Sequence, residues 1–436
     1  MKRWEHQNKV ITWDVTNYYS YLPATFIYGD PLLEFTKENP AAWYDKFVPL
    51  TTPSGNKVIK MTMGLSFVYA PFFAIAHILA PKLGYDNGGY SPPYKFALMM
   101  SSVVFFLIGL LILRKLLSRF FEPKVVIFTL LVVGLGTNLL YYTAIRSAMS
   151  HSYNFALITL FLWLGIKWIE KPRMMNSIYL GLLIGLISLI RPTNSIIIVF
   201  LLFYKVKSFN ALLDRFKLLI TKYYLVLIML ILCVLVWLPQ LIYWKAVSGH
   251  YFYFSYQGEG FFFNNPQIIK GLFGYRNGWF VYTPLMFFSF VGIAFLFKHQ
   301  RDFFWPVLIF ALLNIYIILS WWCWWYVGYG NRPFIDSYGI MAIPFATLIS
   351  WLFSQRNWIR MTSMTLIILF ICLNLFQTWQ YYKGFIQYDS MSKKAYWEVF
   401  LDADPQDKFW GLLEKPDYEK ALKGIYENLP PQEESR

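Results

Sequence analysis

A single carboxylate heads an aromatic stretch near the start of the sequence. Asp14 begins the run DVTNYYSYLPATFIYGDP, and Asp30 lies near its end. Most of the sequence that follows is apolar, and a charge beside apolar surface is costly unless it faces water or a partner. A lone carboxylate in such a place can act as a general base that takes a proton from an attacking hydroxyl group. The alternative is an aspartate that caps a short helix beginning at Val15.

Basic residues that stand apart from the other cations form a second group of candidates. Arg191 lies in the run RPTN and Arg332 in the run GNRPF. A guanidinium group can hold two oxygens of an anion at once, so we predict that these two arginines bind an anionic group. Arg146 and Arg276 are predicted to contact a substrate. For each of these arginines the alternative is a side chain that extends to the membrane surface or bonds helix carbonyls.

Other polar residues are predicted to contact a substrate with less specific chemistry, namely Tyr18, Asp30, His151, Glu259 and Asp336. A polar residue at a helix entry is the alternative for His151. The aromatic and glycine-rich loop 247–279 predicts either a mobile lid over a site or an aromatic belt at the membrane interface. The tryptophans of SWWCWWY, in 320–326, favour such a belt over a sugar-binding platform.

The composition places these residues in a membrane protein. Of 436 residues, 57% are hydrophobic and only 14% charged, and the mean hydropathy is +0.42. The net charge of +15 comes from short clusters of lysine and arginine between apolar runs. That pattern sets membrane orientation and argues against nucleic-acid binding. All three cysteines lie in apolar stretches without metal or disulfide spacing, and no His, Glu or Asp spacing is typical of a tight metal site, so no metal is expected.

The apolar runs predict an all-α bundle of about ten or eleven transmembrane helices, because helices satisfy their own backbone groups in lipid. Two short runs, about 177–190 and 194–206, flank RPTN. The longer runs are about 95–114, 125–143, 151–169, 223–246, 280–297, 304–322, 335–353 and 359–379.

The charged linkers predict the orientation of this bundle. The linkers 114–124 and 205–222 are rich in lysine and arginine and should be cytoplasmic. If every run spans once, the polar tail 380–436 lies outside and is expected to form short helices on the outer face. The outer side then also holds four isolated arginines, Arg146, Arg191, Arg276 and Arg332.

The segment 61–81 decides on which side Asp14 lies. It is long enough to span, but it contains Pro71 and His77. If it spans, residues 1–60 are cytoplasmic. If it lies flat at the interface, Asp14 joins the four arginines outside. We favour the second arrangement, in which 1–94 is an external loop with interfacial helices, 95–379 the helix bundle and 380–436 an external tail.

The order of several motifs resembles the GT-C class of polyprenyl-phosphate-sugar-dependent glycosyltransferases, which includes protein O-mannosyltransferases and lipid A aminoarabinose transferases. Asp14, Tyr18 and Gly29-Asp30 resemble the D-x-x-x-Y…G-D/N stretch of its first outer loop. Lys60 and the segment after it resemble the K-P-P-L start of its interfacial helix. GLLIGLISLIRPTNS, 181–195, is similar to G-L-x-x-G-L-x-x-L-x-R-P-T, and 325–345 is similar to a W-x-x-G-x-x-x-x-x-R…P-x-x-P segment.

The resemblance implies a GT-C membrane enzyme of the cell or inner membrane with an extracytoplasmic active site. It would transfer a hexosyl or pentosyl group from a polyprenyl-phosphate donor to a glycan, lipid or protein acceptor, with inversion, Asp14 as base and no cofactor. Lys60, Arg191 and Arg332 would hold the donor phosphate. Two features depart from the class. Val15 stands where the class has a second acid, and no transmembrane helix precedes Asp14, so we expect a truncated or misassigned start.

Two other functions remain open from the sequence. A multi-pass transporter would also have breaks such as RPTN, but it typically has repeated halves and ionisable residues near the membrane midplane. No internal repeat is visible, and the charged candidates lie at the ends of the predicted helices. A lipid-linked glycan flippase or ligase would share the handling of a lipid phosphate.

Overall fold

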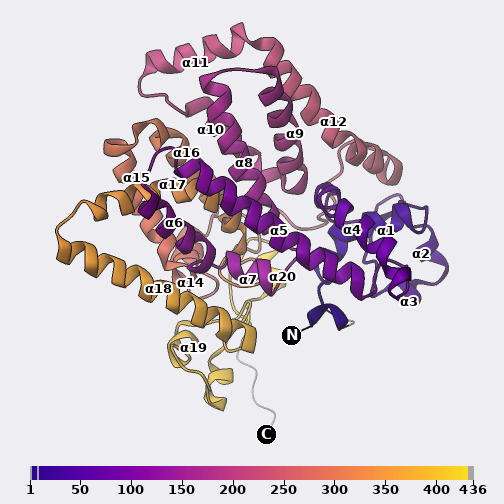
Figure 1. Ribbon diagram of the computed structural model, residues 1–436. Coiled ribbons are helices and arrows are strands. Elements are labelled where there is room, and N and C mark those ends of the chain that lie inside the picture. Colours follow the sequence, from indigo (N-terminus) through magenta and orange to yellow (C-terminus); the bar gives the residue numbers. More distant parts are fainter. Residues whose placement is uncertain (1, 7–8, 431–436) are drawn as a thin grey trace. The chain divides into compact units, whose positions relative to one another are not determined.

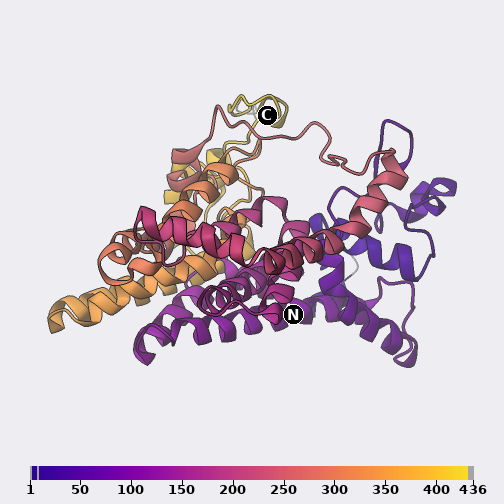
Figure 2. The same cartoon turned by 90° about the horizontal axis from the view of Figure 1, so that it is seen from above.

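The computed structural model describes residues 2–6 and 9–430, and helices dominate both views of it (Figure 1; Figure 2). Helices hold 67% of the residues and strands 2%. Within the described part, seven helices are long and apolar enough to cross a membrane. They are α4 (Gly64–Lys82), α5 (Pro92–Leu117), α8 (Ser150–Glu170), α12 (Tyr223–Ser248), η3 with α16 (Arg301–Leu319), η4 with α17 (Arg332–Phe353) and α18 (Asn357–Lys383).

Four shorter apolar helices accompany them: α6 (Pro123–Leu135), α9 (Met174–Ile190), η2 with α10 (Pro192–Phe203) and α15 (Pro284–His299). The predicted multi-pass helical architecture is confirmed at this level. One two-stranded hairpin, in which β1 (Leu50–Thr51) pairs with β2 (Lys57–Val58), departs from a purely helical fold.

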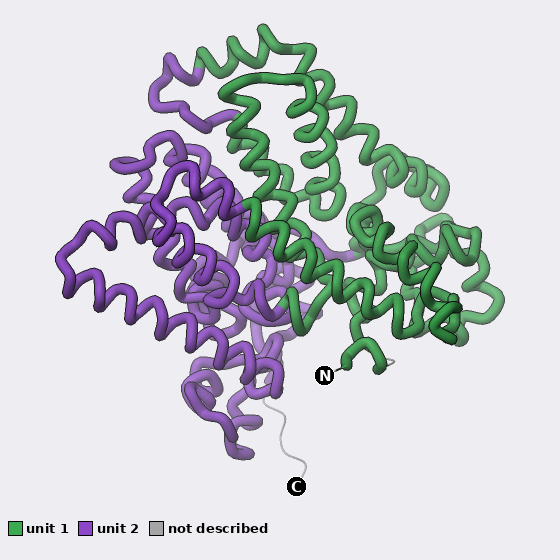
Figure 3. The backbone as a smooth tube through the Cα atoms, in the orientation of Figure 1, with its two compact units in different colours: residues 1–112, 142–201, 213–257 green, residues 113–141, 202–212, 258–436 purple. Residues whose placement is uncertain are grey.

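The chain packs into two compact units of interleaved segments (Figure 3). Unit 1 contains residues 1–112, 142–201 and 213–257, and unit 2 contains 113–141, 202–212 and 258–436. This partition differs from the predicted division at residues 94 and 379. That division concerns position relative to a membrane and stays a prediction. The short α7 (Leu139–Ala144) and α11 (Phe209–Thr221) each contribute residues to both units.

Unit 1 joins the N-terminal segment to the α8, α9 and α12 helices. Its first part contains η1 (Arg3–Glu5), α1 (Asp14–Phe26), α2 (Phe35–Glu38), α3 (Pro40–Trp43) and the hairpin. An aromatic core holds this part on α12, with Tyr21 and Phe47 buried beside Tyr243 and Trp244. Because α12 is a long apolar helix, this core places the N-terminal segment at one helix end.

Close backbone packing joins α9 to α12. A Cβ on Gly181 would lie 2.7 Å from the Met229 carbonyl oxygen, and one on Gly185 would lie 3.0 Å from the Cα of Cys233. Small residues four apart let apolar helices approach in a membrane, where no hydrophobic force drives them together. The glycine spacing in GLLIGL therefore has a packing role.

Unit 2 is built around α17 (Tyr338–Phe353), whose span with η4 has 83% of its apolar window buried. The span of α18 has only 11% buried, so most of its apolar residues would face lipid. The remaining elements are α13 (Ile268–Phe273), α14 (Trp279–Tyr282), η3 (Arg301–Phe303), α16 (Phe304–Leu319), α19 (Lys393–Glu398), η5 (Asp407–Leu412) and α20 (Tyr418–Ala421). The last three confirm the predicted short helices of the tail.

Two predicted continuous runs are broken, so those predictions were wrong in detail. The run 125–143 ends as α6 at Leu135 and resumes as α7, and 280–297 divides into α14 and α15 at Thr283. Pro284 cannot donate a backbone hydrogen bond and begins a new helix. At the first break, the Asn138 amide donates to the carbonyls of Tyr329 (2.9 Å) and Gly330 (2.8 Å). At this break, buried hydrogen bonds from Asn138 thus take the place of a continuous helix.

Candidate functional site

The start of α4 joins the α1 helix, which carries Asp14. Ser66 donates a hydrogen bond to the Tyr18 carbonyl, and the Tyr21 hydroxyl donates to the Met61 carbonyl (2.7 Å). Asp14 and Tyr18 are four residues apart and lie on one face of α1. Asp14 is therefore held one helical turn from the contact between α1 and α4.

Asp14 is half-buried and is the first residue of α1. The N-cap position belongs to Trp13, which has a φ of 56° and is 76% exposed. The capping alternative placed Asp14 itself at that position. The helix therefore begins one residue earlier than the capping alternative requires, and a carboxylate in the first turn is favoured by the helix dipole.

The same start of α4 meets the end of α9, next to Arg191. Thr62 donates a hydrogen bond to the Leu189 carbonyl, and a Cβ on Gly64 would lie 2.5 Å from the Ile190 amide nitrogen. Arg191 is the C-cap of α9, and its carbonyl accepts from the Asn194 amide (2.9 Å), which turns the chain into η2. The RPTN break places the half-buried Arg191 beside α4.

A third contact leads to the segment between Arg146 and His151. The Tyr69 hydroxyl, on α4, donates to the Ala148 carbonyl, and Ala148 has a φ of 67°. His151 lies in the first turn of α8, is 1% exposed and packs edge-on against Tyr142 with ring centroids 5.2 Å apart. Arg146 is half-buried.

Lys60 lies directly before this start and faces an aromatic ring. Its ammonium is 5.1 Å from the centre of the Tyr256 ring, and its carbonyl accepts from Ser255 (2.6 Å). An ammonium over an aromatic face is weakly attracted and stays able to bind an anion. The segment that carries Lys60 is held by α12, because Tyr243 accepts from the Ile59 amide (2.9 Å) and Gln240 accepts from the Met63 amide (2.8 Å).

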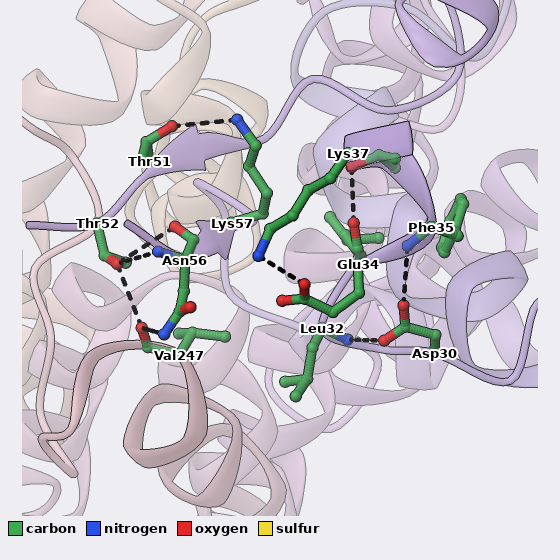
Figure 4. A network of polar contacts seen from close by, with 12 residues as sticks. Asp30, Leu32, Glu34, Phe35, Lys37, Thr51, Thr52, Asn56, Lys57 and Val247 are labelled. Carbon is green, nitrogen blue, oxygen red and sulfur yellow. Dashed lines mark hydrogen bonds and ion pairs between the residues drawn. The ribbon is translucent and has the colours of Figure 1, made fainter. Parts of the chain in front are cut away.

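Asp30 has a local structural role (Figure 4). Its carboxylate accepts hydrogen bonds from the amides of Leu32 (2.9 Å) and Phe35 (3.2 Å). This is the turn that aspartate favours two residues before an amide. In the same view, Thr52 and Asn56 donate to the Val247 carbonyl and attach the hairpin to α12. These contacts explain Asp30 without a substrate, and its predicted substrate contact stays a prediction.

In unit 2, Arg332 and Asp336 lie four residues apart in η4 (Arg332–Ser337), and Asp336 is 2% exposed. Asn331 before them adopts a φ of 44° and donates to the Trp324 carbonyl (3.1 Å). The Tyr338 hydroxyl, which follows them, donates to Asn138 (2.6 Å). Asparagine tolerates this backbone conformation better than most residues, so Asn331 sets the direction in which Arg332 enters its helix.

Arg276 is engaged by the C-terminal tail. Its guanidinium donates to Asn428 Oδ1 (2.8 Å) and to the Glu414 carbonyl, and it lies 5.6 Å from the centre of the Trp325 ring. Burial lowers the pKa of Arg276, while Asp389 and Glu414 act in the opposite direction. These contacts attach the tail to the loop before α14, so a structural role accounts for this arginine.

The C-terminal tail packs on part of the tryptophan cluster. Trp324 and Trp325 are 4% and 1% exposed, and the Tyr418 ring packs edge-on against Trp325 at 5.7 Å. Burial raises the pKa of the neighbouring Cys323 thiol to about 12, while Arg332 lowers it and Glu259 raises it. The charges of Arg332 and Glu259 therefore both affect the pKa of the Cys323 thiol. These two rings are too buried to contribute to an interfacial belt or an open sugar platform. Trp321 and Trp322 are half-buried, so both hypotheses for the cluster stay predictions.

The loop 247–279 is divided between the two units. Its first part bonds within unit 1, where the Gln257 amide donates to the Thr51 carbonyl (2.7 Å). Its second part bonds within unit 2, where the Trp322 amide donates to the Gly260 carbonyl (2.9 Å), beside the half-buried Glu259. The lid and belt hypotheses for this loop stay predictions.

The sequence analysis missed two polar residues that position the candidates, Asn138 and Gln240. Both are fully buried, and both lie within apolar runs, in VGLGTNLL and VWLPQLIY. A polar residue inside an apolar run is expensive in lipid unless it bonds another segment, and this signal was available in both runs. Each joins its helix to a segment that carries a predicted cation, Asn138 to the loop before Arg332 and Gln240 to the segment after Lys60.

Seven of the predicted residues thus belong to unit 1 and four to unit 2. Around the start of α4 lie the segments that carry Asp14, Tyr18, Lys60, Arg146, His151 and Arg191. In unit 2, Glu259, Arg276, Arg332 and Asp336 lie in segments that contact the tryptophan cluster or directly follow it. Among the residues described, no group of three or more His, Cys, Asp or Glu side chains could hold a metal ion.

No family model matches the sequence, and a search of curated proteins gives no significant match.

Proposed function

We propose that this protein is a membrane glycosyltransferase of GT-C type. It would transfer a hexosyl or pentosyl group from a polyprenyl phosphate to a lipid, glycan or protein acceptor on the extracytoplasmic face. The observation that supports this best is the junction at the start of α4. There Ser66 bonds α1 near Asp14, and Thr62 bonds the end of α9 next to Arg191. A carboxylate and a cation from distant parts of the sequence are thereby carried by segments that meet.

The reaction assigns a role to each of these groups. The acceptor oxygen forms a bond to the anomeric carbon while the bond from that carbon to the phosphate oxygen breaks. Asp14 takes the acceptor's proton, and Lys60 and Arg191 hold the departing phosphate. Arg332 belongs to unit 2, and its predicted role in phosphate binding stays a prediction. One base is enough for inversion, because no covalent glycosyl intermediate has to form.

An apolar groove in unit 1 suits the lipid part of such a donor. It has a volume of about 430 Å³ and lies between α4 and the start of α5. Its wall includes Phe72, Ile75, Leu79, Phe96 and Met100. An isoprenoid chain is a hydrocarbon and gains from burial against such side chains.

Release of polyprenyl phosphate tests the proposal against a transporter or a flippase. The purified protein is incubated with a polyprenyl-phosphate sugar labelled in the sugar, together with candidate acceptors. A transferase produces free polyprenyl phosphate and a labelled acceptor in equal amounts. A transporter or flippase in sealed vesicles moves the intact donor across the membrane and leaves its sugar attached. Transport of the intact donor, with its sugar still attached, would contradict the proposed reaction.

A further inference from the structure

Unit 2 contains a polar cavity at the C-terminal end of α17. Its volume is about 390 Å³, and it opens between the first turn of α6, the end of α15 and the end of α17. Arg332 lies at the other end of the η4–α17 span. The wall of the cavity includes Lys124, His299, Thr347, Ser350, Trp351 and Ser354.

The segments of the sequence next to the cavity carry a positive net charge. The linkers 114–125, 298–302 and 354–360 meet the helix ends that form it, and together they hold eight basic and two acidic residues, a net charge of +6 with His299 neutral. The basic residues are Arg114, Lys115, Arg119, Lys124, Lys298, Arg301, Arg356 and Arg360. Within the cavity wall Lys124 and Glu122 carry opposite charges, so the net positive charge that favours an anionic group comes from these flanking segments.

Lys124 provides a movable cation at the mouth of the cavity. Its ammonium lies 5.3 Å from the centre of the Phe353 ring and 2.9 Å from Glu122. The side chains of Lys124 and Glu122 are 54% and 68% exposed, and an ion pair between exposed side chains is weak. The ammonium can therefore leave Glu122 for an anionic phosphate oxygen, because charge-assisted hydrogen bonds are among the strong ones.

The wall has two kinds of surface. Thr347, Ser350 and Ser354 provide hydroxyl groups, whereas Trp351 and Phe353 provide aromatic rings. The Thr347 and Ser354 hydroxyls donate to helix carbonyls and can accept hydrogen bonds from a ligand. The Trp351 ring packs on Phe295 at 4.8 Å, so the aromatic side of the wall is fixed from behind. Hydroxyls beside aromatic rings at the ends of apolar helices suit a molecule with a charged head and a hydrocarbon part.

We propose that this cavity binds the phosphate-bearing headgroup of an anionic phospholipid. Basic pockets between transmembrane helices on the side rich in lysine and arginine are suited to such headgroups. The chemistry required is a phosphate with a short polar substituent, which a lipid or a soluble phosphate ester could provide. This inference does not depend on glycosyl transfer, because none of the residues assigned to that reaction lines the cavity.

The test compares phosphatidylglycerol with phosphatidylcholine in nanodiscs that hold the full chain. Native mass spectrometry counts the retained phosphatidylglycerol, and thermal unfolding gives an independent measure of binding. We expect phosphatidylglycerol to be retained and to raise the unfolding temperature. Lys124→Gln should weaken binding about fivefold, the effect of one lysine near an anionic membrane surface. Ser350→Trp, which fills the cavity, should abolish it.

Arg360→Gln is the matched control. Arg360 belongs to the same basic surface and donates to Asn357 (2.7 Å), but it does not line the cavity. Binding that is unchanged in Arg360→Gln and weakened in Lys124→Gln supports the cavity. A parallel experiment adds glycerol 3-phosphate to phosphatidylcholine nanodiscs; a shift that Lys124→Gln removes supports the same phosphate site with a soluble ligand. Equal losses in Lys124→Gln and Arg360→Gln, or no response to either phosphate, would overturn the proposal.

Discussion

Gly64, the first residue of α4, lies directly against Ile190, the last residue of α9. A Cβ on Gly64 would be 2.5 Å from the Ile190 nitrogen and 2.7 Å from the Leu189 carbonyl carbon. Both neighbours are backbone atoms, which cannot move aside as a flexible side chain can. This approach fixes the distance between α4 and Arg191, the residue after Ile190.

Gly64→Ala is therefore expected to separate α4 from α9. Forcing a methyl group into a packed contact costs typically about 1–3 kcal/mol, and the movement should displace Arg191. We expect a lower unfolding temperature in detergent and reduced glycosyl transfer. Gly411→Ala is the control, because no atom lies within 4 Å of a Cβ there. Normal stability and activity of Gly64→Ala would show that the contact does not position Arg191.

Arg191→Ala is expected to reduce transfer far more than it reduces the amount of folded protein. Removing one preorganised donor from a developing charge lowers kcat about 10²–10³-fold. Arg191→Lys should restore only part of the activity, since an ammonium acts as a point charge. Arg173→Ala, at the exposed N-terminal end of the same helix, is the control. An equal loss of activity and of membrane-inserted protein would assign Arg191 a structural role.

The side on which Asp14 lies can be measured through its neighbour. Trp13 is 76% exposed, so a cysteine there should react readily with a reagent in contact with its side of the membrane. We expect Trp13→Cys, in a background without the native cysteines, to react with an impermeant thiol reagent applied outside. A cysteine at Ser118, in a basic linker, should react only after the membrane is opened. The reverse pattern at Trp13 would mean that α4 spans the membrane.

Cys323 is expected to stay unreactive while the tail covers it. Its pKa is raised to about 12 by burial, so at pH 8 the nucleophilic thiolate is scarcer than in an ordinary cysteine. Tyr418→Ala removes the ring that packs on Trp322 and Trp325 and should speed labelling of Cys323. Trp410→Ala, at a 54% exposed tail position, should not. The measurement is the labelling rate in a chain that keeps Cys323 alone, and fast labelling without the Tyr418 change would contradict a docked tail.

The helices could be predicted from the sequence because a lipid environment demands uninterrupted apolar runs of helical length. The breaks within runs were harder, since the reason for each lies elsewhere in the chain. Asn138 interrupts its run because its amide bonds the carbonyls of Tyr329 and Gly330, about 190 residues away in the sequence. No local pattern indicates that partner, although an asparagine within an apolar run indicates that one exists.

The residue types of the candidate site could be predicted from the sequence, whereas the contacts of these residues could not. The acid and the cations of unit 1 were identified, but the hydrogen bonds of Ser66, Thr62 and Tyr69 depend on tertiary approach and leave no pattern in the sequence. Asp30 shows the opposite case. Its bonds to Leu32 and Phe35 are local, and an aspartate followed by a proline could have been read as a turn.

The most direct test of the account is glycosyl transfer by Asp14→Asn from a defined polyprenyl-phosphate sugar in liposomes. Asparagine keeps the size of the side chain and still suits the first turn of a helix, so the fold should be retained. Loss of a general base is expected to lower the rate about 100-fold or more. The wild-type rate should fall as the medium is acidified, because a protonated carboxyl group cannot accept the acceptor's proton. Asp45→Asn, at an exposed acid of unit 1, should be fully active. An Asp14→Asn protein that is as abundant and as active as the wild type would contradict the central claim.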